Sequence, residues 1–316
     1  MLDTQSKISN LTELNSYIEG LWEKPWLRFL FLELTLRCNE NCVHCGSRCG
    51  ETVSEELSID IYKLFLDRLK RDFGTRDKML CITGGEPLLR KDFFEIVNYA
   101  NLLGFSWGMT SNATLIDKDC AHKLREAGMR TISISIDGLP ETHDELRRTP
   151  RGFERAMKGL NFLIEEGGFE AIQVTTVVTH KSIKELDALY EIFNNIDIDS
   201  WRIIGIEPIG RAKEHPDLML TPEDQKYLFE FIRNKRISGE PVTYGCSHYL
   251  GLTYEREVRD GYFQCMAGTY IASITASGDI IACLDIDRRP EFVQGNILKD
   301  EFFDVWNNKF ACFRKN

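Results

Sequence analysis

Residues 29–50 read FLFLELTLRCNENCVHCGSRCG, an apolar strand-like run that leads directly into a cluster of cysteines. The cysteines are Cys38, Cys42, Cys45 and Cys49. Such a cluster could begin a disulfide framework, a zinc site or an iron–sulfur site. The surrounding sequence has to decide between these possibilities.

The run at residues 29–36 is the first of six β-rich runs that alternate with amphipathic helical patterns. Six such units in series predict an α/β fold with a parallel sheet and helices outside it. Either a doubly wound sheet or a partial (β/α)6 TIM-type barrel would fit, because six units are too few for a closed eight-unit barrel. The expected strands are 29–36, 78–83, 105–110, 131–137, 171–178 and 201–207, and the expected helices are 58–73, 91–104, 117–128, 153–167 and 182–196.

The pattern changes after residue 212. We expect an N-terminal extension over residues 1–28, the barrel over residues 29–212, and a small α+β extension over residues 213–316. In that last part a helix should begin at Thr221 and Pro222, a typical cap and first helical residue. Residues 270–284 predict a β-hairpin with its turn at 277–279.

Composition excludes several classes of protein. The chain has 39 basic and 49 acidic residues, a net charge of −10, and no basic stripe, so nucleic acid is not an expected partner. It has neither a signal-peptide pattern nor an apolar run long enough to span a membrane, so we expect a cytoplasmic protein with no membrane partner. In that compartment cysteines favour metal ligation or reactive thiols over disulfides.

Several short motifs follow the strands. RCNENCVHC follows the first, TGGEP (83–87) the second, TSNAT (110–114) the third, and SIDG (135–138) ends the fourth. In parallel α/β folds these positions lie at one edge of the sheet, where ligands bind. The sequence therefore predicts a single ligand site there.

The spacing C-x3-C-x2-C over Cys38, Cys42 and Cys45 supplies three thiolates, one fewer than a structural zinc site needs. Three thiolates suit a 4Fe-4S cluster in which one iron keeps a non-protein ligand. His44 leaves zinc open as an alternative, since three cysteines and one histidine are a valid zinc set. Cys49 lies outside the motif, and we expect it to be a loop thiol.

The second motif is Gly84-Gly85-Glu86-Pro87. Two glycines would let a ligand approach the backbone closely, and the Glu86 carboxylate could accept a hydrogen bond from an ammonium group. The alternative is that Gly84 and Gly85 only form a strand-to-helix turn.

Together the two motifs resemble the radical S-adenosylmethionine (SAM) superfamily, over about residues 29–212. The resemblance implies a partial barrel, a 4Fe-4S cluster on Cys38, Cys42 and Cys45, and SAM bound at the open iron. Gly84, Gly85 and Glu86 would bind its amino group. Other cofactor contacts that the resemblance implies are Asn112 and Ser135 for ribose or carboxylate, Arg147 (or Arg148) for carboxylate, residues 206–208 for adenine, and His44 in place of an aromatic residue.

The C-terminal part resembles the opening half of the SPASM or twitch extension, which binds auxiliary 4Fe-4S clusters. The shared features are Gly278 and Cys283 in the pattern G-x4-C within the hairpin. Further cysteines of the SPASM pattern are missing after Cys312, so the extension looks shortened and we expect one auxiliary cluster at most. Its ligands would be Cys246, Cys265, Cys283 and Cys312, although buried thiols are the alternative.

The resemblance implies an enzyme that cleaves SAM to a 5′-deoxyadenosyl radical and abstracts hydrogen from a substrate. We expect a peptide or protein side chain, with Asp285 as a candidate base or else a solvated loop residue. An electron donor of the flavodoxin or ferredoxin type would be a partner. Residues 1–28 are too few for a separate leader-peptide-binding domain, so a peptide would bind a partner protein or the barrel itself. The alternatives are a small-molecule dehydrogenase or rearrangement enzyme, an iron–sulfur electron carrier and a zinc protein.

Overall fold

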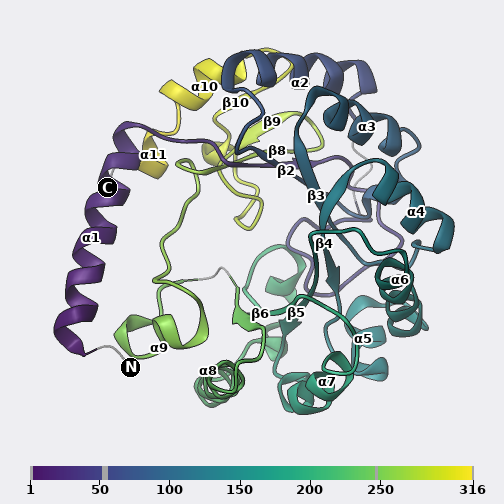
Figure 1. Cartoon of the computed structure of the whole chain (residues 1–316), viewed down its shortest axis with the longest axis vertical. Helices are drawn as coiled ribbons and strands as arrows, with labels where there is room; N and C mark the ends of the chain where they lie inside the picture. The colour runs from purple at the N-terminus through teal and green to yellow at the C-terminus, as the bar shows by residue number, and fades with distance from the viewer. Residues whose placement is uncertain (1–2, 52–55, 246–247, 315–316) are drawn as a thin grey trace.

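The computed structural model describes residues 3–51, 56–245 and 248–314 (Figure 1). Six parallel strands form the middle of its sheet, and they match the six expected runs with small differences at the ends. These strands are β1 (Phe29–Glu33), β2 (Met79–Thr83), β3 (Ser106–Ser111), β4 (Met129–Ser135), β5 (Ala171–Val178) and β6 (Ser200–Gly205). The expected α/β partial barrel is confirmed.

A helix follows each of the first five strands, and these helices form an arc outside the curved sheet (Figure 1). An extra helix, α5 (Pro140–Arg147), comes between β4 and its crossover helix and was not predicted. The five crossover helices are α2 (Ile59–Phe73), α3 (Phe93–Leu103), α4 (Lys118–Glu126), α6 (Gly152–Glu166) and α7 (Leu186–Phe193).

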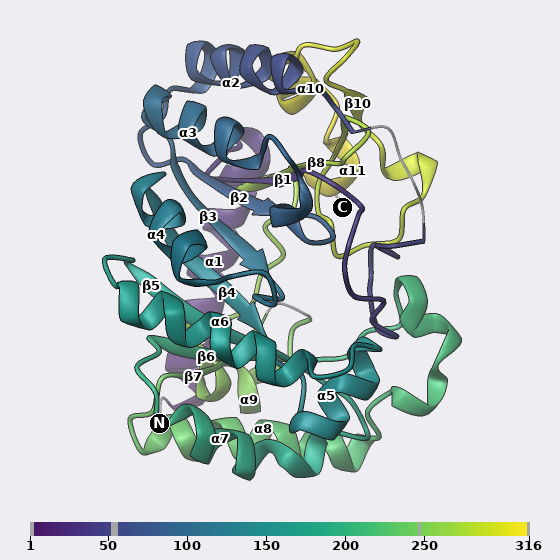
Figure 2. The same ribbon diagram turned by 90° about the vertical axis from the view of Figure 1, so that its right-hand side faces the viewer.

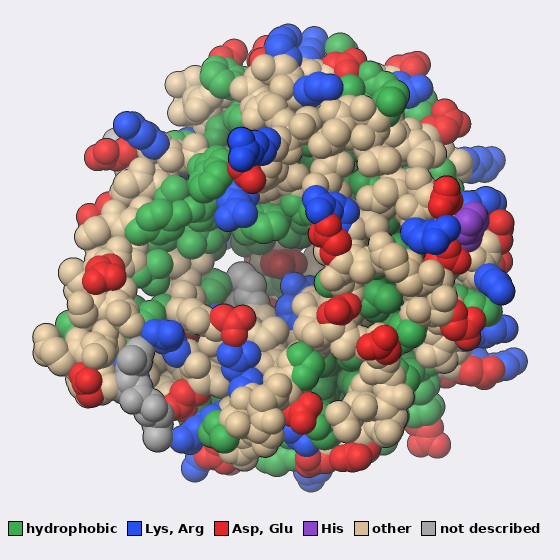
Figure 3. Space-filling view, in the orientation of Figure 1, with side chains coloured by type: hydrophobic (Ala, Val, Ile, Leu, Met, Phe, Trp, Pro, Cys, Tyr) green, Lys and Arg blue, Asp and Glu red, His purple; other side chains and the backbone are tan. Residues whose placement is uncertain are grey.

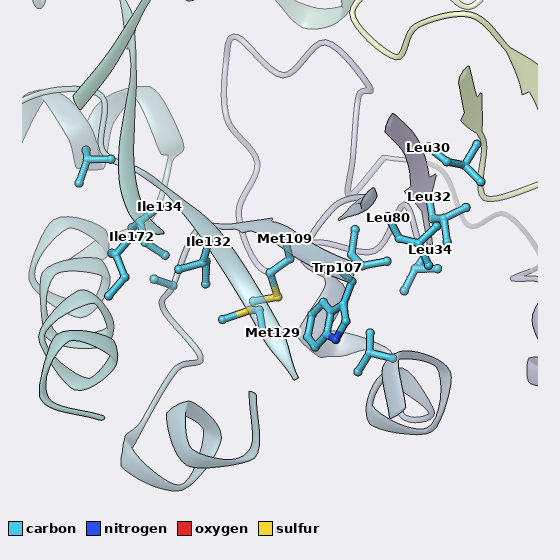
Figure 4. Close-up of a cluster of buried hydrophobic side chains, with 14 of the residues drawn as sticks. Leu30, Leu32, Leu34, Leu80, Trp107, Met109, Met129, Ile132, Ile134 and Ile172 are labelled. Carbon is cyan, nitrogen blue, oxygen red and sulfur yellow. The ribbon is translucent and has the colours of Figure 1, made fainter. Parts of the chain in front are cut away.

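The core lies between the sheet and this arc of helices. Alternate residues of β1 and β4, such as Leu32 and Ile134, are fully buried on the helix-covered side (Figure 4). Burying a side chain of this size stabilises the fold by roughly 1.5–3 kcal/mol. The residues between them, such as Ser133, face the inside of the barrel because side chains alternate along a strand. The inner wall is therefore more polar than the outer one.

The sheet continues beyond residue 212 on both edges. β7 (Val242–Tyr244) pairs in parallel with β6, and β8 (Ile271–Ile274) pairs in parallel with β1. The predicted hairpin is confirmed, because β9 (Asp279–Ile281) runs antiparallel to β8 and is followed by β10 (Gly295–Asn296). The C-terminal part thus shares one sheet with the barrel. The sequence did not predict β7, which is only three residues long.

The remaining helices cover the ends and the open side. The expected helix start is confirmed in α8 (Pro222–Ile237), where Thr221 and Asp224 form a capping box. α1 (Thr4–Glu23) lies across from the arc of helices, near α9 (Gly251–Val258) and α11 (Ala311–Arg314), whereas α10 (Phe302–Asn308) packs against α2 (Figure 1). No helix in the described ranges is long and apolar enough to cross a membrane.

In the orientation of Figure 1 the surface of the protein is hollowed near its centre, with hydrophobic side chains gathered beside the hollow (Figure 3).

Candidate functional site

The two sequence motifs meet at the carboxyl ends of the strands. β1–β4 point the same way, and the loop after β1 lies at their arrowhead end (Figure 2). The Gly85 N–H donates to the Thr35 carbonyl at 2.7 Å, and the Glu86 N–H donates to the Arg37 carbonyl at 2.9 Å. A Cβ atom at Gly85 would lie 2.0 Å from the Arg37 carbonyl oxygen and 3.0 Å from the Cys38 Cβ. Because a glycine has no side chain, the cysteine loop can pack directly against the GGEP turn. The turn therefore lies next to Cys38, the first cysteine of the motif.

Cys38, Cys42 and Cys45 are partly buried thiols on this loop. Burial raises the pKa of Cys38 to about 11 and that of Cys42 further still, so without a cation both remain protonated. Cys45 differs, because hydrogen bonds from Cys49 bring its pKa down to about 5 against the effect of burial. Iron would provide the positive charge that buried thiolates require.

The loop fits a 4Fe-4S cluster better than the zinc alternative. Within the described residues, no three His, Cys, Asp or Glu side chains converge closely enough to hold a single metal ion. A four-iron cube binds each thiolate to a different iron and so holds the thiolates farther apart than one ion does. Backbone N–H groups already point at two of the sulfurs, from Glu40 to Cys38 Sγ and from Cys49 to Cys45 Sγ, each at 3.4 Å. Such hydrogen bonds are typical around cluster thiolates.

A buried charge network lies beside the cysteine loop. Arg147 donates from Nη1 to Glu40 at 2.7 Å and from Nε to Asp137 at 2.8 Å. His44 Nε2 lies 3.2 Å from the same Asp137 oxygen. The pKa of Asp137 falls far below its usual range, because the charge of Arg147 and the contact with His44 outweigh the opposing effect of burial.

This network changes the interpretation of Arg147. We expected it to bind the carboxylate of SAM, but its guanidinium is buried and already bonded to two carboxylates of the protein. Its structural role is to join the cysteine loop, through Glu40, to the end of β4, through Asp137. The alternative residue, Arg148, is exposed and has a left-handed backbone conformation at the end of α5.

Glu86 also differs from expectation. Its carboxylate is fully buried and accepts hydrogen bonds from the Ser111 hydroxyl at 3.0 Å and from the Asn112 N–H at 3.0 Å. Burial raises its pKa to about 7 against these hydrogen bonds. The carboxylate thus fastens the GGEP turn to the turn after β3. Pro87 begins the short 3-10 helix Pro87–Leu89.

The other expected cofactor contacts lie along the same rim. Asn112 is buried and donates to Asn39 Oδ1 of the cysteine loop at 2.9 Å. Ser135 is partly buried at the end of β4. At the end of β6, Ile206 is buried, whereas Glu207 and Pro208 are exposed. The structure brings these positions to one edge of the sheet, as the sequence predicted.

Arg211 also lies on this rim, and the sequence did not predict it. Its side chain is buried and donates to the Cys42 carbonyl at 2.7 Å and to the Cys49 carbonyl at 3.0 Å. Its position right after residues 206–208 was the only available signal. Arginine side chains that bind carbonyl groups leave no periodic pattern in a sequence.

The inner wall of the barrel is lined by hydroxyl and amide groups. Ser133 and Thr175 share a hydrogen bond of 2.7 Å, and Gln173 donates to Ser200 at 2.9 Å. Arg202 Nε donates to the same Thr175 hydroxyl at 3.2 Å. This wall can bind a substrate with several polar groups.

Three of the four C-terminal cysteines proposed as cluster ligands lie within the described residues. Cys246 lies outside the described residues, and the structure has Cys265 and Cys312 exposed and Cys283 partly buried. Asp285 donates its N–H to Cys283 Sγ at 3.4 Å. Although Asp285 is an exposed residue, the protein around it raises the pKa of its carboxyl group by desolvation.

A cavity of about 430 Å³ separates the cysteine loop from the C-terminal loop. Arg288 closes one side of it, donating to Glu33 Oε1 at 2.6 Å and to Ser47 Oγ at 2.7 Å. Since Glu33 belongs to β1 and Ser47 to the cysteine loop, Arg288 connects the C-terminal part of the chain directly to the rim.

Comparisons with known proteins agree with this site. The family model of the Radical SAM superfamily matches residues 32–193, and that of an iron–sulfur cluster-binding domain, SPASM, matches residues 265–316. An AdoMet-dependent heme synthase of Methanosarcina barkeri is 29% identical over 305 residues, which cover 91% of this chain and 84% of the relative. The mycofactocin maturase MftC of Mycobacterium tuberculosis is 31% identical over 287 residues, with 90% and 71% covered.

Two solved structures share the fold. SuiB of Streptococcus suis bound to S-adenosylmethionine has a TM-score of 0.73 at 16% identity, with all of this chain and 74% of that chain covered. The enzyme anSMEcpe with bound AdoMet has a TM-score of 0.71 at 19% identity, with 92% and 84% covered. The expected cofactors, a 4Fe-4S cluster and SAM, are those of the family. This chain belongs to the radical SAM superfamily and is a radical SAM enzyme with a C-terminal SPASM domain.

Proposed function

We propose that this enzyme modifies a peptide or protein side chain by hydrogen abstraction. The observation that carries the proposal is its similarity to the mycofactocin maturase MftC along 90% of the chain, barrel and C-terminal part together. A second support is the likeness of its fold to SuiB, one structure of which is described as bound to the precursor peptide SuiA. The polar inner wall, with Ser133 and Thr175, suits a peptide backbone rich in donors and acceptors.

In this proposal Cys38, Cys42 and Cys45 hold the cluster, and the backbone at Gly84, Gly85 and Glu86 binds the amino group of SAM. With SAM, the reduced cluster supplies a 5′-deoxyadenosyl radical. Asn112, Ser135 and His44 are available to orient the cofactor from the same rim. Arg147 holds the loop that carries the cysteines, so the remaining contacts to the SAM carboxylate come from other residues. Substrate and cofactor must be held close together and shielded from water.

The electron would come from a small donor protein of the flavodoxin or ferredoxin type. We propose one auxiliary cluster in the C-terminal part, with Cys265, Cys283 and Cys312 as candidate ligands together with Cys246. Asp285, next to that cysteine cluster in sequence, is the proposed base. Its raised pKa supports this role.

A small-molecule substrate is the second candidate. It is supported by the similarity to AdoMet-dependent heme synthases, which extends over 91% of this chain for the relative from Methanosarcina barkeri. The inner wall of this barrel, with its hydroxyl and amide groups, would then bind the polar substituents of the small molecule.

The cofactor assignment is tested by anaerobic reconstitution with iron and sulfide, followed by reduction in the presence of SAM. We expect about four irons for the barrel cluster, about eight with one auxiliary cluster, and release of 5′-deoxyadenosine. Cys38→Ala, Cys42→Ala and Cys45→Ala should each abolish this release. Cys120→Ala, on the outer helix α4, is the matched control and should retain it. Cleavage of SAM by any of the three variants would contradict the assignment.

The substrate is tested by mass spectrometry of reaction mixtures. Short peptides encoded beside the gene are incubated with the reduced enzyme and SAM, in parallel with iron porphyrins. A mass change in a peptide that requires both SAM and Cys45 supports the peptide assignment. A change confined to the porphyrin supports the second candidate and contradicts the first.

A further inference from the structure

Cys49 lies directly behind the third cysteine of the motif. It is only 3% exposed, and its N–H group donates to Cys45 Sγ at 3.4 Å. The Cys49 thiol also lies close enough to the Cys45 sulfur to interact with it. The backbone N–H and the side chain of one residue thus both face the same sulfur atom.

Arg211 reaches the same part of the loop from the end of β6. Its own N–H donates to the Cys45 carbonyl at 3.1 Å. Its guanidinium donates to the Cys42 and Cys49 carbonyls at 2.7 and 3.0 Å, and to Glu51 Oε1 at 2.9 Å. Arg211 therefore binds the carbonyl groups of three cysteines at once, with a side chain that is almost completely buried.

Gly210 shows how closely the two segments fit. Its backbone has φ +54°, and a Cβ atom there would lie 2.3 Å from the carbonyl oxygens of both Cys45 and Gly46. Any larger residue would push Arg211 away from the loop. The contact is therefore specific to the Gly210-Arg211 pair and fixes the direction of the Cys49 peptide.

We infer that Cys49 and Arg211 form a clamp on Cys45, as positioning residues that set the geometry and the reduction potential of the cluster without being its ligands. The inference rests on the ligand set proposed above. Hydrogen bonds to a cluster sulfur stabilise the more negative, reduced state, and so does a nearby buried cation. Arg211 acts in two ways, through its charge and by binding the carbonyl groups of Cys42, Cys45 and Cys49, which limits movement of the loop around the Cys45 sulfur.

The test compares four variants in the reconstituted, full-length enzyme: Cys49→Ala, Cys49→Ser, Arg211→Gln and Arg211→Lys. Midpoint potentials and spectra of the reduced cluster are measured by redox titration followed by electron paramagnetic resonance. Iron content is measured on the same samples. We expect Cys49→Ala and Arg211→Gln to shift the potential to more negative values while the irons are retained. Cys49→Ser keeps a side-chain donor and Arg211→Lys keeps the charge, so both should recover part of the shift.

The controls are Cys120→Ala and Arg37→Gln. Arg37 lies on the same loop, but its guanidinium is nearly half exposed and its ion pair is with Glu56, which is not a partner of Arg211. Both variants should keep the wild-type potential. A shift of equal size in Arg37→Gln would show that any lost charge near the loop suffices, and would overturn the clamp.

Two other results would overturn the inference. One is an unchanged potential in Cys49→Ala and Arg211→Gln at full iron content. The other is a complete cluster in Cys45→Ala that disappears in the double variant with Cys49→Ala, which would make Cys49 a ligand. If the proposed ligand set were wrong, the result would be distinguishable, because Cys38→Ala and Cys42→Ala would then keep the iron of the cluster.

Hydrogen exchange of the cluster-free enzyme gives a readout independent of iron. If the clamp holds the loop, Arg211→Lys and Arg211→Gln should speed exchange at residues 45–50 relative to wild type and to Arg37→Gln. Equal exchange in all of these proteins would overturn the positioning role. If Arg211→Gln fails to fold, Arg211→Lys and the two Cys49 variants still decide the question.

Discussion

The carboxylate of Glu40, between the first two cysteines of the motif, accepts a hydrogen bond of 2.7 Å from Arg147, 107 residues later in the chain. Both side chains are buried, and Arg147 also binds Asp137. The cysteine loop is therefore anchored to the barrel before any cluster binds. A buried arginine between two carboxylates is costly to disrupt, because removing it leaves two buried carboxylates without their shared cation.

Replacing Arg147 by Gln should lower the free energy of unfolding by about 3–5 kcal/mol, the usual loss when one partner of a buried ion pair is removed. The free energy of unfolding of Arg147→Lys should lie between those of Arg147→Gln and wild type, because a lysine keeps the charge but cannot contact both carboxylates in the same way. The measurement is chemical denaturation of the cluster-free protein. Arg148→Gln, on the exposed neighbour, is the matched control and should change stability by less than about 0.5 kcal/mol. Equal effects in the two variants would contradict the anchoring role.

Gly85→Ala should impair assembly of the site. The added Cβ would overlap the Arg37 carbonyl and press on Cys38, so the GGEP turn and the cysteine loop would have to separate. We expect lower iron content after reconstitution and weaker SAM binding in isothermal titration. Gly20→Ala, in the last turn of α1, has nothing within 4 Å of its Cβ and should leave both properties unchanged. Normal SAM affinity in Gly85→Ala would show that the turn tolerates the separation.

Glu86 should make stability depend on pH. Burial raises its pKa from the ordinary 4.5 to about 7, so the folded state holds the proton more tightly than the unfolded chain does. The stabilisation from the bound proton is complete below pH 4.5 and is lost as the pH rises to about 7. At 1.36 kcal/mol per pKa unit, the loss is about 3 kcal/mol.

The measurement is the unfolding free energy of the cluster-free protein between pH 4.5 and 8, for wild type and Glu86→Gln. The variant lacks this titration, so the difference between the two proteins should change across the interval in favour of the variant. A difference that stays constant with pH would show that Glu86 keeps an ordinary pKa in the folded protein.

Arg288→Gln should loosen the contact between the C-terminal part and the rim. The Glu33 carboxylate is buried and would keep only the Ala276 N–H, at 3.2 Å, among its bonds to described residues. Because Arg288 is itself about a third exposed, we expect a loss of roughly 1–3 kcal/mol in the free energy of unfolding. Faster hydrogen exchange is expected in residues 284–293.

Arg289→Gln is the control for this variant, since Arg289 pairs only with the exposed Glu291 among the described residues. It should change stability by less than about 0.5 kcal/mol. If Arg289→Gln loosens the loop as much as Arg288→Gln does, the bond to Glu33 is not what holds the C-terminal part in place.

Much of the fold could be predicted from the sequence because it depends on local patterns. Alternating apolar runs such as residues 171–178 define strands whatever surrounds them, and Thr221 with Asp224 defines a helix start within four residues. The same locality explains what was missed. β7 is three residues long, and β8 pairs with β1 from the far end of the chain, so neither has a local signal that places it in the sheet.

The sequence by itself determined the chemistry of the site: three cysteines on one loop after the first strand and a glycine pair after the second. Ligand type and spacing are local properties, and they point to a cluster with one iron left open. Only the tertiary structure decided the roles of the charged residues. It shows that Arg147 and Glu86 bind other parts of the protein and hold the site together. It also shows that Arg211 and Cys49 lie next to Cys45. The reason is that a buried charge takes its role from its partners, and in this fold those partners come from other strands.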